Sequence, residues 1–187
     1  MNIILFGPPG AGKGTQSKYI AKKIDGIQIS TGDILRDEIT KNTDIGKIIS
    51  NDMNEGKFVS DEIVNMLVKK IIFDPHEKNN FIFDGYPRSL SQAQYLDAML
   101  KNSNQRINFI FSLNVSKEII IKRIEKRKSI EKRSDDELNT IIARYNTYIK
   151  TTKPVIDFYS KNSNFYEIDG DKEKSIISSK IEQILTV

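Results

Sequence analysis

Hydrophobic and polar residues form two kinds of block along this chain. Short runs rich in β-branched and aromatic residues predict strands, and they occupy residues 2–6, 27–29, 81–84, 107–113 and 165–168. Longer stretches with apolar residues at helical spacing separate these runs. Strands that are almost continuously apolar and alternate with helices are typical of a parallel sheet covered on both faces. We therefore expect residues 1–187 to form a single three-layer α/β domain around a parallel five-stranded sheet.

Three of the helical stretches carry an N-terminal signal. In each, a serine is followed three residues later by an acidic or amide residue, which is the pattern of a helix with a capped first turn. The pairs are Ser30 with Asp33, Ser89 with Gln92, and Ser134 with Glu137. We expect a helix to begin after each of these serines.

Two segments depart from the alternation of strands and helices. Residues 30–59 have helical patterning with no intervening strand, and breaks are expected at Asn42–Thr43 and at Gly56. Residues 128–133 are expected to form a short polar break between two helices. Both segments are candidates for mobile pieces that lie over a binding site.

The composition narrows the class of protein. The 187 residues carry a net charge of +4 and include no cysteine, which excludes a disulfide framework and agrees with a cytoplasmic location. The longest early apolar run, residues 3–6, is too short for a signal sequence or a membrane span. The positive charge is better explained by a ligand with several phosphates than by nucleic acid, because the lysines are scattered among acidic residues.

Arginine is scarce in this chain, which has 22 lysines and seven arginines. A planar guanidinium binds phosphate or carboxylate through two parallel hydrogen bonds, so the few arginines are candidates for such sites. Compositional drift alone also fits the ratio. The seven are Arg36, Arg88, Arg106, Arg123, Arg127, Arg133 and Arg144.

The strongest motif is GPPGAGKGT at residues 7–15, which follows the first expected strand and opens a helix at about Lys13. Its glycines let successive backbone N–H groups turn towards a phosphate, and Lys13 can reach the β- and γ-phosphates. An ordinary glycine-rich turn is the alternative, which the position of the Gly–Lys pair disfavours. Residue 14 is glycine where the general motif has serine or threonine, and Thr15 follows one position later, so the magnesium-binding hydroxyl of a switch-type NTPase is missing.

This form of the loop resembles that of the adenylate kinases, and two further segments resemble signatures of the same family: STGDILR (30–36) and DGYPRSLSQ (84–92). The spacing of RIEKR (123–127), RSDDELNTIIAR (133–144) and IDGDK (168–172) also fits, so the resemblance covers essentially the whole chain. It implies reversible phosphoryl transfer from ATP to AMP with ADP as the product. It also implies Mg²⁺ as cofactor, no zinc, a monomer, and neither a nucleic-acid nor a membrane partner.

The resemblance implies roles for individual residues. ATP would be bound by Gly10, Ala11, Gly12, Lys13, Gly14, Thr15, Arg127 and Lys172. AMP would be bound by Thr31, Arg36, Lys57, Phe58, Val59, Gly85, Tyr86, Pro87, Arg88, Gln92, Arg133 and Arg144. Phosphoryl transfer would depend on Lys13, Arg88, Arg123, Arg127, Arg133 and Arg144, while Asp84 would hold Mg²⁺ through water. Arg106 has no counterpart and is expected at the surface.

Helical spacing directs several arginines towards a cleft. Between residues 117 and 128 the expected buried stripe is Ile120, Ile121 and Ile124, with Arg123 and Arg127 on its edge and Lys122 and Lys126 on the solvated side. Arg144 similarly borders a stripe made by Leu138, Ile141, Ile142 and Tyr145. Snorkelling over apolar surface explains any one of these arginines alone. A cleft that receives all three side chains explains why Arg123, Arg127 and Arg144 border their stripes together.

The expected reaction needs no catalytic base. The acceptor is an ionised phosphate oxygen, so the site must align two polyanions and neutralise their charge. His76, the one histidine, is expected to be a solvated loop residue. Residues 30–59 and a lid at 128–138 are expected to close over the nucleotides and exclude water. With six residues between Arg127 and Ser134 and no cysteine, the lid is expected to be the short form without zinc.

Other functions fit the sequence less well. A UMP/CMP kinase of the same fold is the nearest alternative, although such kinases carry alanine where this chain has Thr31. A nucleotide-switch protein would need N-K-x-D and D-x-x-G strings, and neither occurs in the chain. A kinase-like fold without catalysis is opposed by the complete arginine set. An Asp at a strand end, such as Asp84, is by itself more often a turn former.

Overall fold

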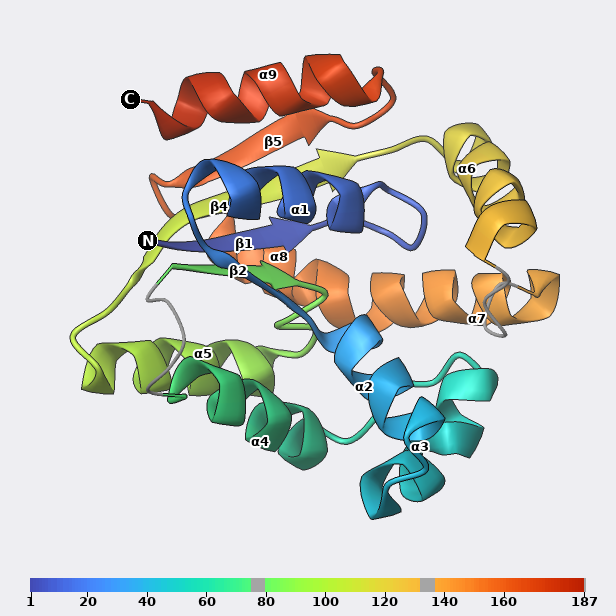
Figure 1. The fold of residues 1–187 in the computed structure, drawn as a ribbon. Coiled ribbons are helices and arrows are strands. Elements are labelled where there is room, and N and C mark those ends of the chain that lie inside the picture. The colour runs from blue at the N-terminus through green and yellow to red at the C-terminus, as the bar shows by residue number, and fades with distance from the viewer. Residues whose placement is uncertain (75–79, 132–136, 187) are drawn as a thin grey trace.

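A parallel five-stranded sheet forms the centre of the computed structural model, which describes residues 1–74, 80–131 and 137–186 (Figure 1). The strands lie in the order β2–β3–β1–β4–β5, and every neighbouring pair is parallel. Their bounds are β1 Asn2–Phe6, β2 Ile27–Ser30, β3 Phe81–Asp84, β4 Ile107–Asn114 and β5 Phe165–Asp169. The expected strands and their parallel arrangement are confirmed.

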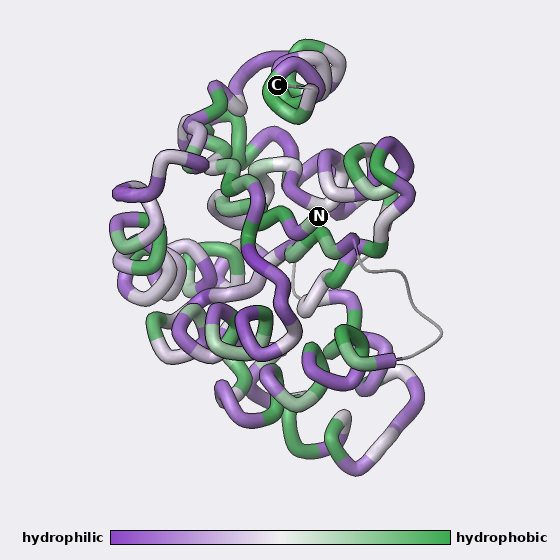
Figure 2. The backbone as a smooth tube through the Cα atoms, turned by 90° about the vertical axis from the view of Figure 1, so that its left-hand side faces the viewer, coloured by the Kyte–Doolittle hydropathy of each residue, from purple (hydrophilic) through white to green (hydrophobic). Residues whose placement is uncertain are grey.

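Helices cover both faces of the sheet, as a parallel sheet requires. On one face, α1 (Lys13–Lys23) and α9 (Lys174–Leu185) pack over a cluster that includes Leu5 and Phe111. On the other face, α4 (Asp61–Ile72), α5 (Leu90–Asn102) and α8 (Lys153–Tyr159) pack over a cluster that includes Ile4 and Phe83 (Figure 1). The helices show mixed green and purple turns in Figure 2, as amphipathic helices do.

The remaining helices lie beside this core in two pairs (Figure 1). Residues 30–59 hold α2 (Thr31–Thr40) and α3 (Asp44–Asn54), with no strand between them, as the sequence predicts. Gly56 has a φ of +72° in the turn that follows α3. The other two helices are α6 (Lys117–Glu131) and α7 (Leu138–Thr147), and α7 lies against the end of α3, since Thr140 Oγ1 donates to Asn54 O at 3.3 Å. A π-helical turn, Tyr148–Thr152, joins α7 to α8. None of the helices in the described ranges is both long and apolar enough to cross a membrane.

Two of the three predicted helix starts are confirmed by their caps. Ser30 Oγ accepts a hydrogen bond from Asp33 N at 3.4 Å, and Ser89 Oγ accepts one from Gln92 N at 3.1 Å. Ser134 lies outside the described residues. Glu137 directly precedes α7, whose first helical residue is Leu138.

The predicted polar break at 128–133 is wrong over its first part, because α6 continues through Glu131. Neither glycine nor proline occurs in this stretch, and its Lys, Ile and Glu residues are compatible with a helix. Polarity alone therefore does not end it. The buried apolar stripes of α6 and α7 are also narrower than predicted. Ile120 and Ile124 of α6 are buried, but Ile121 of α6 and Ile142 of α7 are 41% and 51% exposed.

The register of the sheet brings the carboxyl ends of three strands together. Asp84 at the end of β3 is level with Leu5 of β1 on one side and with Ser30 of β2 on the other. The loop that follows β1 leaves the sheet beside them. In open α/β sheets, ligands bind at this edge of the sheet.

Candidate functional site

The glycine-rich loop after β1 curls back on itself before the chain enters α1. It turns through a hydrogen bond from Ala11 N to Pro8 O at 3.1 Å, and α1 begins directly after it at Lys13. Gly10 has a φ of +80°, and a Cβ at this position would lie 2.8 Å from Ile124 Cγ1 of α6. Only glycine meets both conditions. The loop thus packs closely against α6 and presents a helix N-terminus, which attracts anions.

Lys13 lies across the mouth of this loop. Its ammonium donates to the carbonyls of Gly7 at 2.7 Å and of Pro8 at 3.0 Å. Burial is the main cause that lowers the pKa of Lys13 from 10.5 to about 8. The nearby Asp84 carboxylate raises this pKa, while the positive charges of Arg88, Arg144 and Arg127 lower it further. Four cations and one carboxylate therefore act on the same small volume.

Asp84 faces the first turn of α1 from the end of β3. It is 8% exposed, and its Oδ2 accepts a hydrogen bond from Gln28 Nε2 of β2 at 3.0 Å. A Cβ on Gly14 would lie 3.4 Å from the same oxygen, so the glycine leaves the carboxylate room against the loop. Mg²⁺ is commonly held by one or two carboxylates together with waters and substrate phosphates. A single carboxylate beside a phosphate-binding loop fits such an ion.

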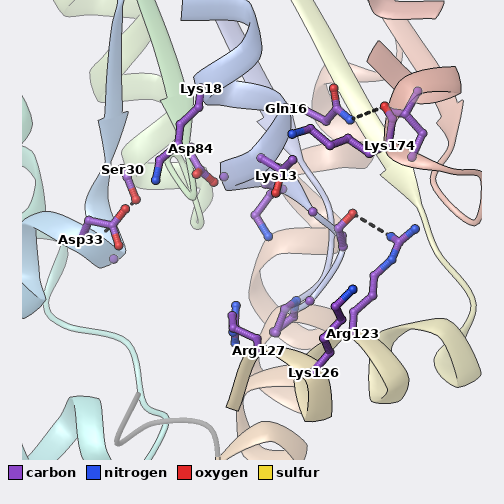
Figure 3. Close-up of a pocket in the computed structure, with 18 of the residues that line it drawn as sticks. Lys13, Gln16, Lys18, Ser30, Asp33, Asp84, Arg123, Lys126, Arg127 and Lys174 are labelled. Atoms are coloured by element: carbon purple, nitrogen blue, oxygen red, sulfur yellow. Dashed lines mark hydrogen bonds between the residues drawn. The ribbon is translucent and has the colours of Figure 1, made fainter. Parts of the chain in front are cut away.

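A pocket of about 500 Å³ opens beside the loop and brings most of the candidate ATP site together (Figure 3). Side chains of α1, α2 and α6 are among those that line it, and the positive charges outnumber the negative ones. The predicted residues that line it are Gly10, Ala11, Gly12, Lys13, Gly14, Thr15, Arg36, Asp84, Arg88, Arg123, Arg127, Arg144 and Lys172. No group of three or more His, Cys, Asp or Glu side chains suited to a metal occurs among the residues that the structure describes.

Arg123 links the glycine-rich loop to the turn after β5. Its guanidinium donates to Ala11 O at 3.2 Å (Figure 3) and to Lys172 O at 3.1 Å. Gln16 makes a parallel link, because its Nε2 donates to Lys174 O at 3.2 Å. These two bonds hold the residues 172–174 close to the start of α1.

The carbonyl of Gly85 joins two parts of the candidate AMP site. It accepts one hydrogen bond from Thr31 Oγ1 at 2.8 Å and another from Arg88 Nε at 2.6 Å. Gly85 has a φ of +74°, and a Cβ there would lie 2.7 Å from an Arg88 nitrogen. The Arg88 guanidinium also lies over the Phe58 ring, with Cζ 4.9 Å from the ring centroid.

A second, smaller pocket adjoins the first and shares Lys13, Arg88 and Arg144 with it. Three further predicted residues line it: Phe58, Gly85 and Pro87. The other residues predicted to contact the AMP base or its surroundings are buried, with exposed fractions of 2% for Thr31, 5% for Val59, 1% for Tyr86 and 3% for Gln92. These four side chains, which are expected to line the acceptor base, are thus shielded from solvent in this conformation.

Some predicted residues do not join the pockets. Lys57 lines neither one, and its Nζ instead pairs with Glu55 at 2.6 Å on the surface. Arg106 is exposed at the opposite end of the sheet, as expected. Arg133 and His76 lie outside the described residues. Lys126, which was expected on the solvated side of its helix, is exposed but lines the larger pocket.

Several residues of the site were missed by the sequence analysis. Gln28 and Asp33 each contact a candidate residue. Gln28 donates a hydrogen bond to Asp84, and Asp33 forms an ion pair with Arg36 at 2.5 Å. Asp61 accepts hydrogen bonds from the start of α5. A polar residue inside the apolar strand 27–30 was a usable signal for Gln28. Asp33 and Asp61 carried no such signal, because an isolated aspartate near a helix start most often caps the helix or interacts with its dipole.

Comparison with known proteins agrees with the geometry of this site. The family model described as adenylate kinase matches residues 5–164. The chain belongs to the adenylate kinase family. The adenylate kinase of Pelagibacter ubique is 47% identical, over 100% of both chains. The adenylate kinase of Archaeoglobus fulgidus is 37% identical, over 99% of this chain and 98% of its own.

A difference in length separates these adenylate kinases from others in the family. The alignment with the Pelagibacter ubique protein extends over 213 positions, against the 187 residues of this chain. The adenylate kinase of a Nocardioides species, which is 37% identical, aligns over 187 positions that cover 100% of this chain and 98% of its own. Adenylate kinases of both lengths are thus among its relatives.

Proposed function

We propose that this adenylate kinase family member transfers the terminal phosphoryl group of ATP directly to AMP, in the reversible reaction ATP + AMP = 2 ADP. The observation that carries the proposal is the common pocket of Lys13, Arg88, Arg127 and Arg144 beside the phosphate loop. Two polyanions repel each other, and a preorganised cluster of cations offsets this repulsion and the charge of the transition state. The names of the relatives support the same reaction.

On the donor side, the backbone N–H groups of residues 10–15 would hold the ATP phosphates. Lys13 would leave the carbonyls of Gly7 and Pro8 and turn to the β- and γ-phosphates. Arg127 would contact the same phosphates. The bonds of Arg123 to Ala11 and Lys172 favour a place for this arginine on the donor side.

On the acceptor side, Arg36, Arg88 and Arg144 would bind the AMP phosphate. The bond from Arg88 Nε to Gly85 and the stack on Phe58 support a guanidinium that is oriented before the ligand arrives. Arg133 would join this group. The base and sugar would be lined by Thr31, Lys57, Phe58, Val59, Gly85, Tyr86, Pro87 and Gln92.

The chemistry requires alignment and not proton removal. An AMP phosphate oxygen attacks the γ-phosphorus in line as the bond to the ADP oxygen breaks, with no covalent enzyme intermediate. Mg²⁺, held with ATP and by Asp84 through water, would supply further neutralisation of phosphate charge. Lys13 and the arginines stabilise the charge on the transferring group while it passes between the two nucleotides.

We further propose that residues 30–59 and a short lid at 128–138 move during the cycle. The burial of Thr31, Val59 and Gln92 supports motion of the first segment, because a base reaches these side chains only after it opens. The match in length with the Nocardioides relative supports the short form of the lid. We also expect the protein to act as a cytoplasmic monomer on free nucleotides.

A coupled assay of ADP formation tests the proposal, with AMP, UMP, CMP and dAMP as acceptors and with or without Mg²⁺. We expect Mg²⁺-dependent activity and a strong preference for AMP. Comparable kcat/KM values for AMP and UMP would favour a UMP/CMP kinase. No ADP formation with any acceptor would remove the enzymatic proposal altogether.

A further inference from the structure

Asp61 lies at the first position of α4, just after the segment 30–59, and three hydrogen-bond donors converge on its carboxylate. Ser89 Oγ donates to Oδ2 at 2.7 Å, and Ser91 Oγ donates to the same oxygen. Gln92 Nε2 donates to Oδ1 at 2.7 Å. The carboxylate thus ties the start of α4 to the first turn of α5. The proposed reaction gives Asp61 no role.

The neighbours of the Gln92 amide determine which of its ends is nitrogen and which is oxygen. While Nε2 faces Asp61, Oε1 accepts a hydrogen bond from Arg88 N at 2.7 Å. A carboxylate only accepts and a backbone N–H only donates. The reversed amide would oppose two acceptors at Asp61 and two donors at Arg88. Because Gln92 is 3% exposed, water cannot easily replace the lost partners.

The fixed amide keeps one donor and one acceptor for a ligand. A primary amide has two N–H donors and an oxygen with two lone pairs, and the protein bonds engage one of each. The edge of adenine offers an acceptor at N1 and a donor at the 6-amino group, which is the complementary pair. Hypoxanthine has the same size but reverses the pattern, with a donor at N1 and an acceptor oxygen at position 6.

We propose that Asp61 is a positioning residue that sets the base preference of the AMP site by fixing the orientation of the Gln92 amide. This inference rests on the proposed function, in which Gln92 contacts the acceptor base. Asp61 does not itself touch the nucleotide. Without its carboxylate only Arg88 N orients the amide, which can then turn over and accept a 6-oxopurine. Loss of Asp61 therefore lowers the AMP-to-IMP ratio of kcat/KM more than it lowers kcat/KM for AMP itself.

The test compares kcat/KM for AMP and IMP, with ATP as donor, in the wild type and in Asp61→Ala. IMP differs from AMP only at the edge that Gln92 would read. We expect the AMP-to-IMP ratio to fall by about tenfold or more, since unpaired buried groups cost this much in selectivity. The KM for ATP should stay within about twofold. Ser91→Ala is the matched control, because it removes a donor from Asp61 without touching the bond to Gln92, and its ratio should match the wild type.

Two outcomes separate the failure of this inference from that of the proposed function. A wild type that does not prefer AMP over IMP contradicts base reading by Gln92. A wild type that prefers AMP, with a folded Asp61→Ala whose two kcat/KM values fall in parallel, contradicts only the role of Asp61. If Asp61→Ala does not fold, Asp61→Asn replaces it. Asparagine can present either an oxygen or an NH₂ group to Gln92, so the ratio should still fall by at least about threefold. An unchanged ratio overturns the proposal.

Discussion

The Arg88 guanidinium lies over the ring of Phe58, with Cζ 4.9 Å from the ring centroid. The bond from Arg88 Nε to Gly85 O at 2.6 Å fixes the same group from its edge. A stack and an edge bond together define the plane of the guanidinium before any phosphate binds. This geometry depends on the planar shape of the side chain, which lysine does not have.

Arg88→Lys should therefore cost much more than an exchange of one cation for another. The variant keeps the charge but loses the bond to Gly85, the planar stack and the two parallel bonds to a phosphate. We expect kcat/KM for AMP to fall by about a hundredfold or more, with the KM for ATP much less changed. Steady-state kinetics with each nucleotide varied in turn measures this. Arg106→Lys, at an exposed position, is the control and should resemble the wild type, and equal effects of the two changes would refute the argument.

Lys13→Met should remove most of the activity while the fold is retained. The methionine keeps the apolar stem but cannot donate to phosphate. We expect a fall in kcat on the order of 10³-fold, since several kcal/mol of transition-state stabilisation are lost. Circular dichroism and thermal melting would check the fold. Activity within about tenfold of the wild type, in a folded variant, would exclude Lys13 from catalysis.

Nucleotide binding should take up a proton at alkaline pH. The pKa of Lys13 is about 8 without ligand, mainly because of burial, so above pH 8 most of the unliganded protein has a neutral lysine. Phosphate charge raises this pKa, and the lysine is then protonated on binding. Titration calorimetry at pH 9 in two buffers of different ionisation enthalpy should show uptake in the wild type. Lys13→Met should not show it.

The same lowered pKa affects folding stability with a definite sign. Between pH 8 and 10.5 the unfolded chain binds more protons at Lys13 than the folded one does. The contribution of this group to stability therefore increases as the pH rises through this window. Lys13→Met should gain stability over the wild type below pH 8 and lose that advantage towards pH 10.5, as denaturant unfolding at both ends would measure.

Thr31→Ala should narrow the preference for AMP over UMP and also weaken AMP binding. The Thr31 hydroxyl already donates to Gly85 O at 2.8 Å, so it contributes to the carbonyl that orients Arg88 as well as to the base pocket. We expect the AMP-to-UMP ratio of kcat/KM to fall by roughly tenfold. The KM for AMP should rise and the KM for ATP should change little. Thr40→Ala, on the same helix but exposed, should leave all three values unchanged, and a Thr31→Ala enzyme that keeps the wild-type ratio would rule out base recognition by Thr31.

Much of the fold and half of the site followed from local sequence patterns. The five strands were predictable because each is a short run rich in β-branched and aromatic residues, and the place of Lys13 was predictable because it depends on neighbours within the same loop. The C-terminal end of α6 was not predictable. Residues 128–131 are mostly polar but contain no helix breaker, so their polarity did not end the helix. Ile121 was misplaced because spacing gives the direction of a side chain but not which neighbours reach it.

The contacts of Gln28 and Asp61 could not be predicted for a different reason. Gln28 bonds Asp84 across 56 positions in the sequence, and Asp61 bonds Gln92 across 31. No periodicity connects residues at such separations. Only the sheet register and the packing of α4 against α5 bring them together, and these are properties of the folded chain.

The unequal state of the two halves of the site matters for the search for small inhibitors. The phosphate-binding side of the site is an open pocket of about 500 Å³, whereas the side chains expected to contact the acceptor base, Thr31, Val59 and Gln92, are at most 5% exposed. A fragment screen against the unliganded protein would therefore collect molecules from the phosphate-loop side and overlook the acceptor base site. Compounds for the second half should be sought with a donor analogue already bound and should be compared by how fast they associate, because each must wait for the helical segment to open.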